Sequence, residues 1–194
     1  MVCESLFVFK KITMKIMHNK LVNFAFYQTG WLLCVFGAVH GFVILSILFA
    51  LFFIAMHIRC SSRKLNEVFY VMTVMICGYV IDSLLVMIGL FSYEAMGVDY
   101  LAPIWIAALW AMFSVTIDSS MSWMTDKYIT ASVLGGIFGP LAYYAAEKIG
   151  AVYILTDYSL LTQAMVWAVV MPLLFFSHKK VYENLFLIRQ EKIL

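Results

Sequence analysis

Charged residues are scarce in this chain. They make up 12% of its 194 residues, whereas soluble domains carry about a quarter, and hydrophobic residues make up 64%. A water-soluble fold of this length cannot hide so much apolar surface. The scarcity of charge therefore excludes an ordinary soluble domain and predicts a protein embedded in a lipid bilayer.

The sequence motifs of several function classes are also missing. There is no Gly-rich phosphate loop, RNA-binding sheet motif or zinc-finger spacing, so nucleic acid is not expected as a partner. Acyl transfer lacks its G-x-S-x-G elbow, and prenyl transfer lacks its paired Asp-rich motifs. The histidines are scattered without an i,i+4 pair, so we expect no metal ion and no cofactor. They are His18, His40, His57 and His178.

Cysteine is rare and shows no pairing pattern. The four cysteines form no C-x-x-C motif and no paired extracellular set. We therefore predict free thiols that pack as small apolar groups.

The positive charges that are present are unevenly distributed. Hydrophobic runs predict six spans, at about residues 21–38, 42–58, 67–90, 103–123, 128–149 and 160–178. From a cytoplasmic N-terminus, this threading puts twelve of the 13 Lys and Arg residues on one side, and only Lys148 on the other. Short cytoplasmic loops attract Lys and Arg. The pattern predicts an all-α polytopic transmembrane bundle of six helices with both termini cytoplasmic.

The chain therefore divides into one membrane domain, at 17–178, and two flanking segments. Residues 1–16 form a basic extension, which is either a surface anchor or the result of a start upstream of Met17. Residues 179–194 alternate apolar and charged side chains and predict a cytoplasmic amphipathic tail. The first apolar block is too long for one span, so it must turn at residues 37–41.

Ionisable residues inside spans are costly, and by default they mark binding sites or contacts that lock helices together. Three carboxylates within the predicted spans stand out: Asp82 in the third, Asp118 in the fourth and Glu147 in the fifth. Each has two open interpretations, a contact to a ligand or proton, or a hydrogen bond that holds helices together. For Glu147 the neighbouring Lys148 also predicts a local ion pair.

We expect a pocket between the third, fourth and fifth spans, where these polar side chains would converge. Asp82 and Trp105 would lie near its outer mouth, and Asp118 would be a deeper polar contact. No catalytic residue is assigned. The candidate ligand-binding residues are Asp82, Ser83, Trp105, Asp118, Tyr143 and Glu147.

Other polar and small residues in the spans predict helix packing. Amides near a span end commonly cross-link helices, and glycines let another backbone or a ligand come close. A proline inside a span predicts a kink, so the fifth span is either tightly packed or broken along a cavity. The candidate packing or kink residues are Asn23, Gln28, Gly135, Gly136, Gly139 and Pro140.

Several short motifs follow one another in a specific order. They are Asn19-Lys20-Leu21-Val22-Asn23-Phe24, Gln28-Thr29-Gly30-Trp31, Gly37-Ala38, Asp82-Ser83-Leu84-Leu85, Pro103-Ile104-Trp105, Leu109-Trp110 and Gly139-Pro140-Leu141-Ala142-Tyr143. Over residues 17–178 the chain resembles an uncharacterised, domain-of-unknown-function family of small six-span bacterial inner-membrane proteins. The resemblance implies the inner membrane of a Gram-negative bacterium, favours Met17 as the usual start and brings no established activity. An amide and a histidine are expected in relatives at Asp118-Ser119, so this chain departs from them there.

Three function hypotheses follow from these observations. The first is binding or translocation of a small lipophilic or amphipathic molecule, with membrane lipid as the expected partner. The second is a membrane enzyme that acts on lipid, with Asp82 or Asp118 as acid or base. The third is a non-catalytic assembly factor whose small-residue faces bind another membrane protein.

Overall fold

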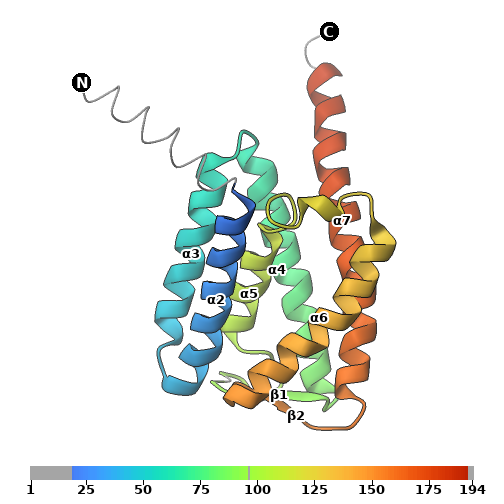
Figure 1. The fold of residues 1–194 in the computed structure, drawn as a ribbon. Helices are drawn as coiled ribbons and strands as arrows, with labels where there is room; N and C mark the ends of the chain where they lie inside the picture. Colours follow the sequence, from blue (N-terminus) through green and yellow to red (C-terminus); the bar gives the residue numbers. More distant parts are fainter. Residues whose placement is uncertain (1–18, 96, 192–194) are drawn as a thin grey trace, which may run out of the picture.

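The chain folds into a helical bundle with one very small sheet. A computed structural model describes residues 19–95 and 97–191, and Figure 1 shows their arrangement. The helices are α2 (Lys20–His40), α3 (Val43–Cys60), α4 (Lys64–Met87), α5 (Ile104–Ser114), the 3₁₀ helix η1 (Ser122–Met124), α6 (Tyr128–Ile149) and α7 (Ser159–Glu191). The strands are β1 (Phe91–Tyr93) and β2 (Val152–Ile154). The expectations for residues 1–16 and for Cys3 lie outside the described residues.

The bundle carries apolar side chains on its outside and polar ones within. Among the described residues, five helices are long and apolar enough to cross a membrane: α2, α3, α4, α6 and α7 up to Val181. Leu65 and Ile129 are more than 80% exposed, whereas Asn23, Asp82 and Gln163 are almost completely buried. Lipid, unlike water, tolerates such an exterior. The protein is a polytopic helical membrane protein.

The first two helices form a hairpin with a tight turn. α2 ends at Gly41, whose φ of 79° is a left-handed conformation that glycine adopts at little cost. Ser46 of α3 donates a hydrogen bond to the Leu33 carbonyl oxygen at 2.6 Å. Gly37 leaves space for this hydroxyl, which a Cβ at that position would meet. The hairpin is therefore closed by one small residue and one buried hydroxyl.

The helix expected at 103–123 is shorter than predicted, because α5 ends at Ser114. Its 11 residues rise only about 16 Å, against a hydrocarbon thickness of about 30 Å. The Ser114 and Thr116 hydroxyls donate to carbonyl oxygens three residues earlier, which favours tight turns over α-helix. Residues 111–117 are all buried. Backbone at the depth of the lipid tails can be non-helical only where protein surrounds it, so this burial permits the turns that follow α5.

A two-stranded sheet joins the ends of two helices at one end of the bundle. Strands β1 and β2 pair antiparallel, with Phe91 opposite Ile154 and Tyr93 opposite Val152. Sequence patterns do not predict these strands, since three-residue strands leave no periodic signal. We call this the sheet end. The opposite end carries the α3–α4 and α5–α6 connections (Figure 1), and we call it the basic end after Arg59, Arg63, Lys64 and Lys127.

The two C-terminal spans pack closely on one another. Gly135 and Gly139 of α6 lie against Met171 and Trp167 of α7, so tightly that a Cβ at either glycine would collide. Pro140 lies inside α6. α7 is helical as far as Glu191, beyond the membrane span that ends at Val181, so the helix includes most of the region expected as an amphipathic tail from residue 179 (Figure 1).

Candidate functional site

A partly enclosed cavity of about 670 Å³ lies within the membrane bundle. Its wall includes residues of α2, α4, α5, α6 and α7, together with the turns after α5. It reaches from Val152 at the sheet end to Trp123 and Met124 at the basic end. Most of the lining is apolar, and the polar side chains on it are few. Such a lining favours a ligand that is mainly hydrophobic.

All five tryptophans of the chain line this cavity. Trp110 and Trp167 stack with ring centroids 4.9 Å apart and planes 6° apart, which joins α5 to α7. Trp105 donates its Nε1 hydrogen to the Glu94 carbonyl oxygen at 3.1 Å and is 1% exposed. Trp31 and Trp123 complete the set. The intrinsic fluorescence of the protein therefore reports almost entirely on the cavity wall.

Asp82 is the acidic side chain among the described residues of the wall, and three donors contact it. Tyr93 and Tyr143 donate their hydroxyls to Oδ1 at 2.9 and 2.5 Å, and Trp110 donates its Nε1 hydrogen to Oδ2 at 2.6 Å. The donors come from β1, α6 and α5, while Asp82 belongs to α4 and is fully buried. One carboxylate thus connects four elements.

Gly78 makes room for this arrangement one helical turn before Asp82. A Cβ at Gly78 would collide with the Trp110 ring. Ser83, next in the chain, accepts a hydrogen bond from the Ala102 amide at 3.2 Å and so fixes the loop that precedes α5. Asp82 and Ser83 both have identified hydrogen bonds that position neighbouring elements.

Two polar groups of residues on the cavity wall have no hydrogen-bond partner within 19–95 and 97–191, the described part of the chain. They are the Nε1 hydrogen of Trp167 and the hydroxyl of Ser120, both buried at the atom level. A buried donor without a partner costs about 1–3 kcal/mol. The Asn23 side chain, by contrast, donates to the Val115 carbonyl oxygen and accepts from the Ser120 amide, which ties α2 to the turns after α5. Gln28 lines the cavity from α2.

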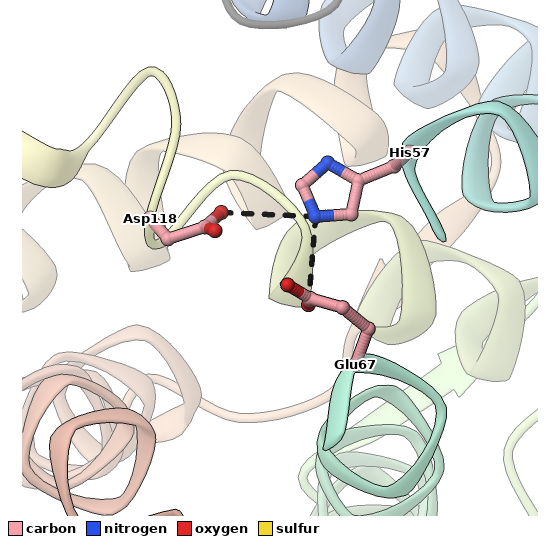
Figure 2. A group of neighbouring side chains, drawn as sticks. All are labelled: His57, Glu67 and Asp118. Carbon is pink, nitrogen blue, oxygen red and sulfur yellow. Dashed lines mark ion pairs between the residues drawn. The ribbon is translucent and has the colours of Figure 1, made fainter. Parts of the chain in front are cut away.

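A second cluster lies near the basic end of the bundle, where His57, Glu67 and Asp118 converge (Figure 2). The His57 Nε2 atom is 3.5 Å from Glu67 Oε2 and 3.8 Å from Asp118 Oδ1. The residues come from α3, α4 and the turns after α5. Glu67 is buried and accepts a hydrogen bond from the Ser61 hydroxyl at 3.1 Å, whereas the Asp118 side chain is one-third exposed.

The structure distributes the candidate ligand residues over different places. Asp82, Trp105 and Tyr143 line the cavity. Asp118 belongs to the second cluster and is not part of the cavity lining. Glu147 forms an ion pair with Lys148 at 3.4 Å, as the neighbouring charges indicated.

Several partners in these two sites cannot be predicted from sequence patterns. Tyr93 and Trp110 donate to Asp82 from positions 11 and 28 residues away. His57 and Glu67 were not linked to Asp118. Helix spacing finds partners only along one helix face, and these contacts join different elements. The one available signal was Gly78, which permits a large ring to approach one turn from Asp82.

The sheet end has its own polar contact outside the spans. The Tyr153 hydroxyl donates to Glu94 Oε2 at 2.8 Å, and this hydrogen bond raises the pKa of Tyr153, with a smaller contribution from the Glu94 charge. The phenol is therefore neutral throughout the physiological pH range. Because Glu94 also accepts from Trp105 through its backbone oxygen, this contact positions the outer part of the cavity wall.

The chain belongs to a family described as "Protein of unknown function (DUF2878)", which it matches over residues 20–173. The match covers all the spans apart from the C-terminal part of α7. No curated protein and no solved structure matches the chain.

Proposed function

We propose that the cavity binds or translocates a small lipophilic or amphipathic molecule, with a membrane lipid as the most direct candidate. The observation that carries this proposal is a tryptophan-lined cavity of about 670 Å³ inside a membrane bundle. Ligand pockets typically measure about 300–1,000 Å³, with mostly apolar walls and a few polar groups that fix orientation. A molecule that partitions into the bilayer reaches such a site without crossing water.

The unpartnered polar groups support an amphipathic ligand over a plain hydrocarbon. The N–H donor of Trp167 and the hydroxyl of Ser120 belong to residues of the wall and have no hydrogen-bond partner among the described residues. A ligand with one acceptor group, such as an ester or carboxyl oxygen, would satisfy Trp167 while its apolar part contacts the aromatic rings. Nearer the sheet end, the wall residues proposed to surround the ligand are Asp82, Trp105 and Tyr143.

Binding is favoured over acid–base catalysis by the state of Asp82. Its two oxygens already accept three hydrogen bonds from Tyr93, Trp110 and Tyr143. A carboxylate engaged in this way is poorly placed to exchange protons with a substrate. We therefore assign Asp82 a positioning role in the wall.

We further propose that the protein lies in a bacterial inner membrane with its basic end in the cytoplasm. Arg59, Arg63, Lys64 and Lys127 gather at that end, and cytoplasmic loops are enriched in Lys and Arg. The part of the cavity lined by Trp123 would then lie toward the inner leaflet.

The test fills the cavity with a side chain. Ala142 lies on the wall and Val133, on the same helix, is 54% exposed and outside the lining. A phospholipid with brominated acyl chains is titrated into the detergent-solubilised protein, and quenching of tryptophan fluorescence is recorded. We expect Ala142→Phe to weaken saturable quenching by about tenfold or more, equivalent to about 1.4 kcal/mol. Val133→Phe should behave like the wild type.

Native mass spectrometry provides the second readout. Lipid retained by the wild type and by Val133→Phe, but lost from Ala142→Phe, supports the proposal. Non-saturable quenching that is equal in all three proteins would contradict it, because the lipid would then contact only the outer surface.

A further inference from the structure

We propose that His57, Glu67 and Asp118 form a binding site for one divalent transition-metal ion of the zinc type. The three side chains come from α3, α4 and the turns after α5, and their ligand atoms lie within 4.8 Å of one another. Figure 2 shows the His57 imidazole directed at both carboxylates. This inference does not depend on lipid binding, and its three residues are not part of the cavity lining.

The burial and the contacts of the His57 imidazole are those expected of a side chain that binds a metal ion. His57 is 9% exposed, and among the described residues its buried Nε2 atom has no partner in hydrogen-bonding geometry. Both facing carboxylate oxygens, on Glu67 and Asp118, lie beyond good hydrogen-bond distance, at 3.5 and 3.8 Å. A buried nitrogen between two carboxylates is better satisfied by a cation that all three groups share than by either loose contact alone.

The spacing is close to that of a metal centre. In a tetrahedral site with bonds of about 2.0–2.2 Å, neighbouring ligand atoms are about 3.3–3.6 Å apart. The separation of His57 Nε2 from Glu67 Oε2, 3.5 Å, already meets this requirement. Asp118 Oδ1 is 3.8 Å from His57 Nε2 and the three ligand atoms lie within 4.8 Å of one another, so Asp118 would have to move closer, and its side chain is one-third exposed. The fourth position would be open to water.

The donor set selects the class of metal. One imidazole nitrogen and two carboxylate oxygens suit zinc and neighbouring first-row ions, whereas Ca²⁺ and Mg²⁺ prefer oxygen ligands alone. The hydrogen bond from Ser61 to Glu67 Oε1 orients that carboxylate so that Oε2 faces His57. Such support from outside the ligand shell is typical of metal sites.

A bound ion would also fix part of the cavity wall. Asp118 stands two residues before Ser120 and three before Met121, both of which line the cavity at the basic end. Coordination would connect this non-helical segment to α3 and α4, which hold the other two ligands. The ion would therefore stabilise the shortened end of the fourth span.

The experiment uses Zn²⁺ itself and the full chain, purified without an affinity tag of histidines. After treatment with a chelator and its removal, Zn²⁺ is titrated by calorimetry in detergent without added lipid, and bound zinc is counted by elemental mass spectrometry. We expect one ion per chain. Asp118→Ala and His57→Gln should weaken binding by at least about 100-fold, because even supporting residues of metal sites change affinity by 10–100-fold.

The control variants remove the same residue types, a carboxylate and a histidine, at positions outside the proposed site. Asp126→Asn removes an exposed carboxylate near the same end, and His40→Gln removes an exposed histidine at the opposite end. Both should bind Zn²⁺ like the wild type. Because His57→Gln alters a buried residue, a further readout uses the wild type alone: Co²⁺ should give intense visible absorption bands of a low-coordinate site, which Zn²⁺ abolishes.

Either of two results would overturn the proposal. The first is a wild type that retains no stoichiometric Zn²⁺ and gives only the spectrum of hydrated Co²⁺. The second is wild-type affinity in a folded Asp118→Ala protein, which would place the ion elsewhere. Lipid binding is measured separately, so failure of one proposal does not decide the other.

Discussion

The two carboxylate sites of this bundle differ in the groups that contact the carboxyl oxygens. At Asp82, three neutral donors on Tyr93, Trp110 and Tyr143 converge on one carboxylate. At His57 the direction is reversed, because two carboxylates converge on one imidazole. The first site is complete with protein groups alone. The second gathers acceptors, and we propose that a cation completes it.

The difference shows how a membrane bundle can use the same residue type for two purposes. A buried carboxylate that is fully hydrogen-bonded acts as a structural junction, since removing it leaves several donors unsatisfied. A carboxylate that converges with other metal ligands is instead available for an ion. Mutations at the two sites should therefore separate stability from metal binding.

Replacing Asp82 should give the largest loss of stability. Asp82→Ala leaves three buried donors without an acceptor, each costing about 1–3 kcal/mol, so we expect a total of at least about 3 kcal/mol. Asp118→Ala should change the stability of the metal-free protein by less than about 0.5 kcal/mol, since its side chain is partly exposed. Unfolding titrations with a denaturing detergent measure both.

Asp99→Ala serves as the control for Asp82, because Asp99 is an exposed carboxylate in the loop between β1 and α5. Equal losses at Asp82 and Asp99 would show that the three donors find other partners when Asp82 is removed. The contrast between the two sites would then no longer hold.

Much of the fold was accessible from sequence, because hydropathy and charge report directly on membrane spans. The apolar runs predicted a bundle of six helices, and the pairing of Glu147 with Lys148 followed from adjacent charges. The end of α5 at Ser114 was not predictable, since residues 115–117 have a composition that also suits a membrane-spanning helix. Their path depends on burial by surrounding helices, which composition does not reveal.

The candidate site could be predicted from sequence only in part, because it too depends on how the helices pack. Asp82, Trp105 and Tyr143 were named together, and the structure places all three on the cavity wall. Asp118 was assigned to the same pocket, but it lies with His57 and Glu67. Helical spacing indicates which face a residue occupies, whereas the choice between two neighbouring sites depends on how helices rotate against one another.

A smaller effect is expected when Asp82 loses one donor. Tyr143→Phe removes a single hydroxyl, and hydrogen bonds to charged groups contribute about 1.5–3 kcal/mol. Tyr144→Phe is the matched control, because this neighbour is 45% exposed and its ring keeps the contact with Lys148. Unfolding free energies of the two variants measure the difference directly.

A double-mutant cycle with Trp110→Phe sharpens the same point. Both donors share Asp82, so their contributions should be coupled by about 0.5 kcal/mol or more. Strict additivity would argue that Tyr143 and Trp110 act on Asp82 independently, and that the junction is a set of separate contacts.

The smallest effect should come from Asp126, an exposed carboxylate with a single cationic partner. Its hydrogen bond from Lys179, at 2.8 Å, lowers the pKa of Asp126 below the ordinary value of 3.8. A lowered pKa stabilises the folded state above the unfolded pKa, and this contribution disappears as the pH falls through the folded value. Stability differences between wild type and Asp126→Asn should therefore be constant near neutral pH and shrink below about pH 4.

Thermal unfolding of both proteins at pH 7 and pH 3, in low and high salt, tests this. High salt should reduce the difference at pH 7, because exposed pairs are screened. A difference that persists unchanged at pH 3 would mean that Asp126 acts through backbone conformation, since its φ of 64° is itself favourable for asparagine. In that case the stability change at Asp126 would come from its backbone geometry. The number of hydrogen-bond donors would then explain the stability loss at the buried Asp82 alone.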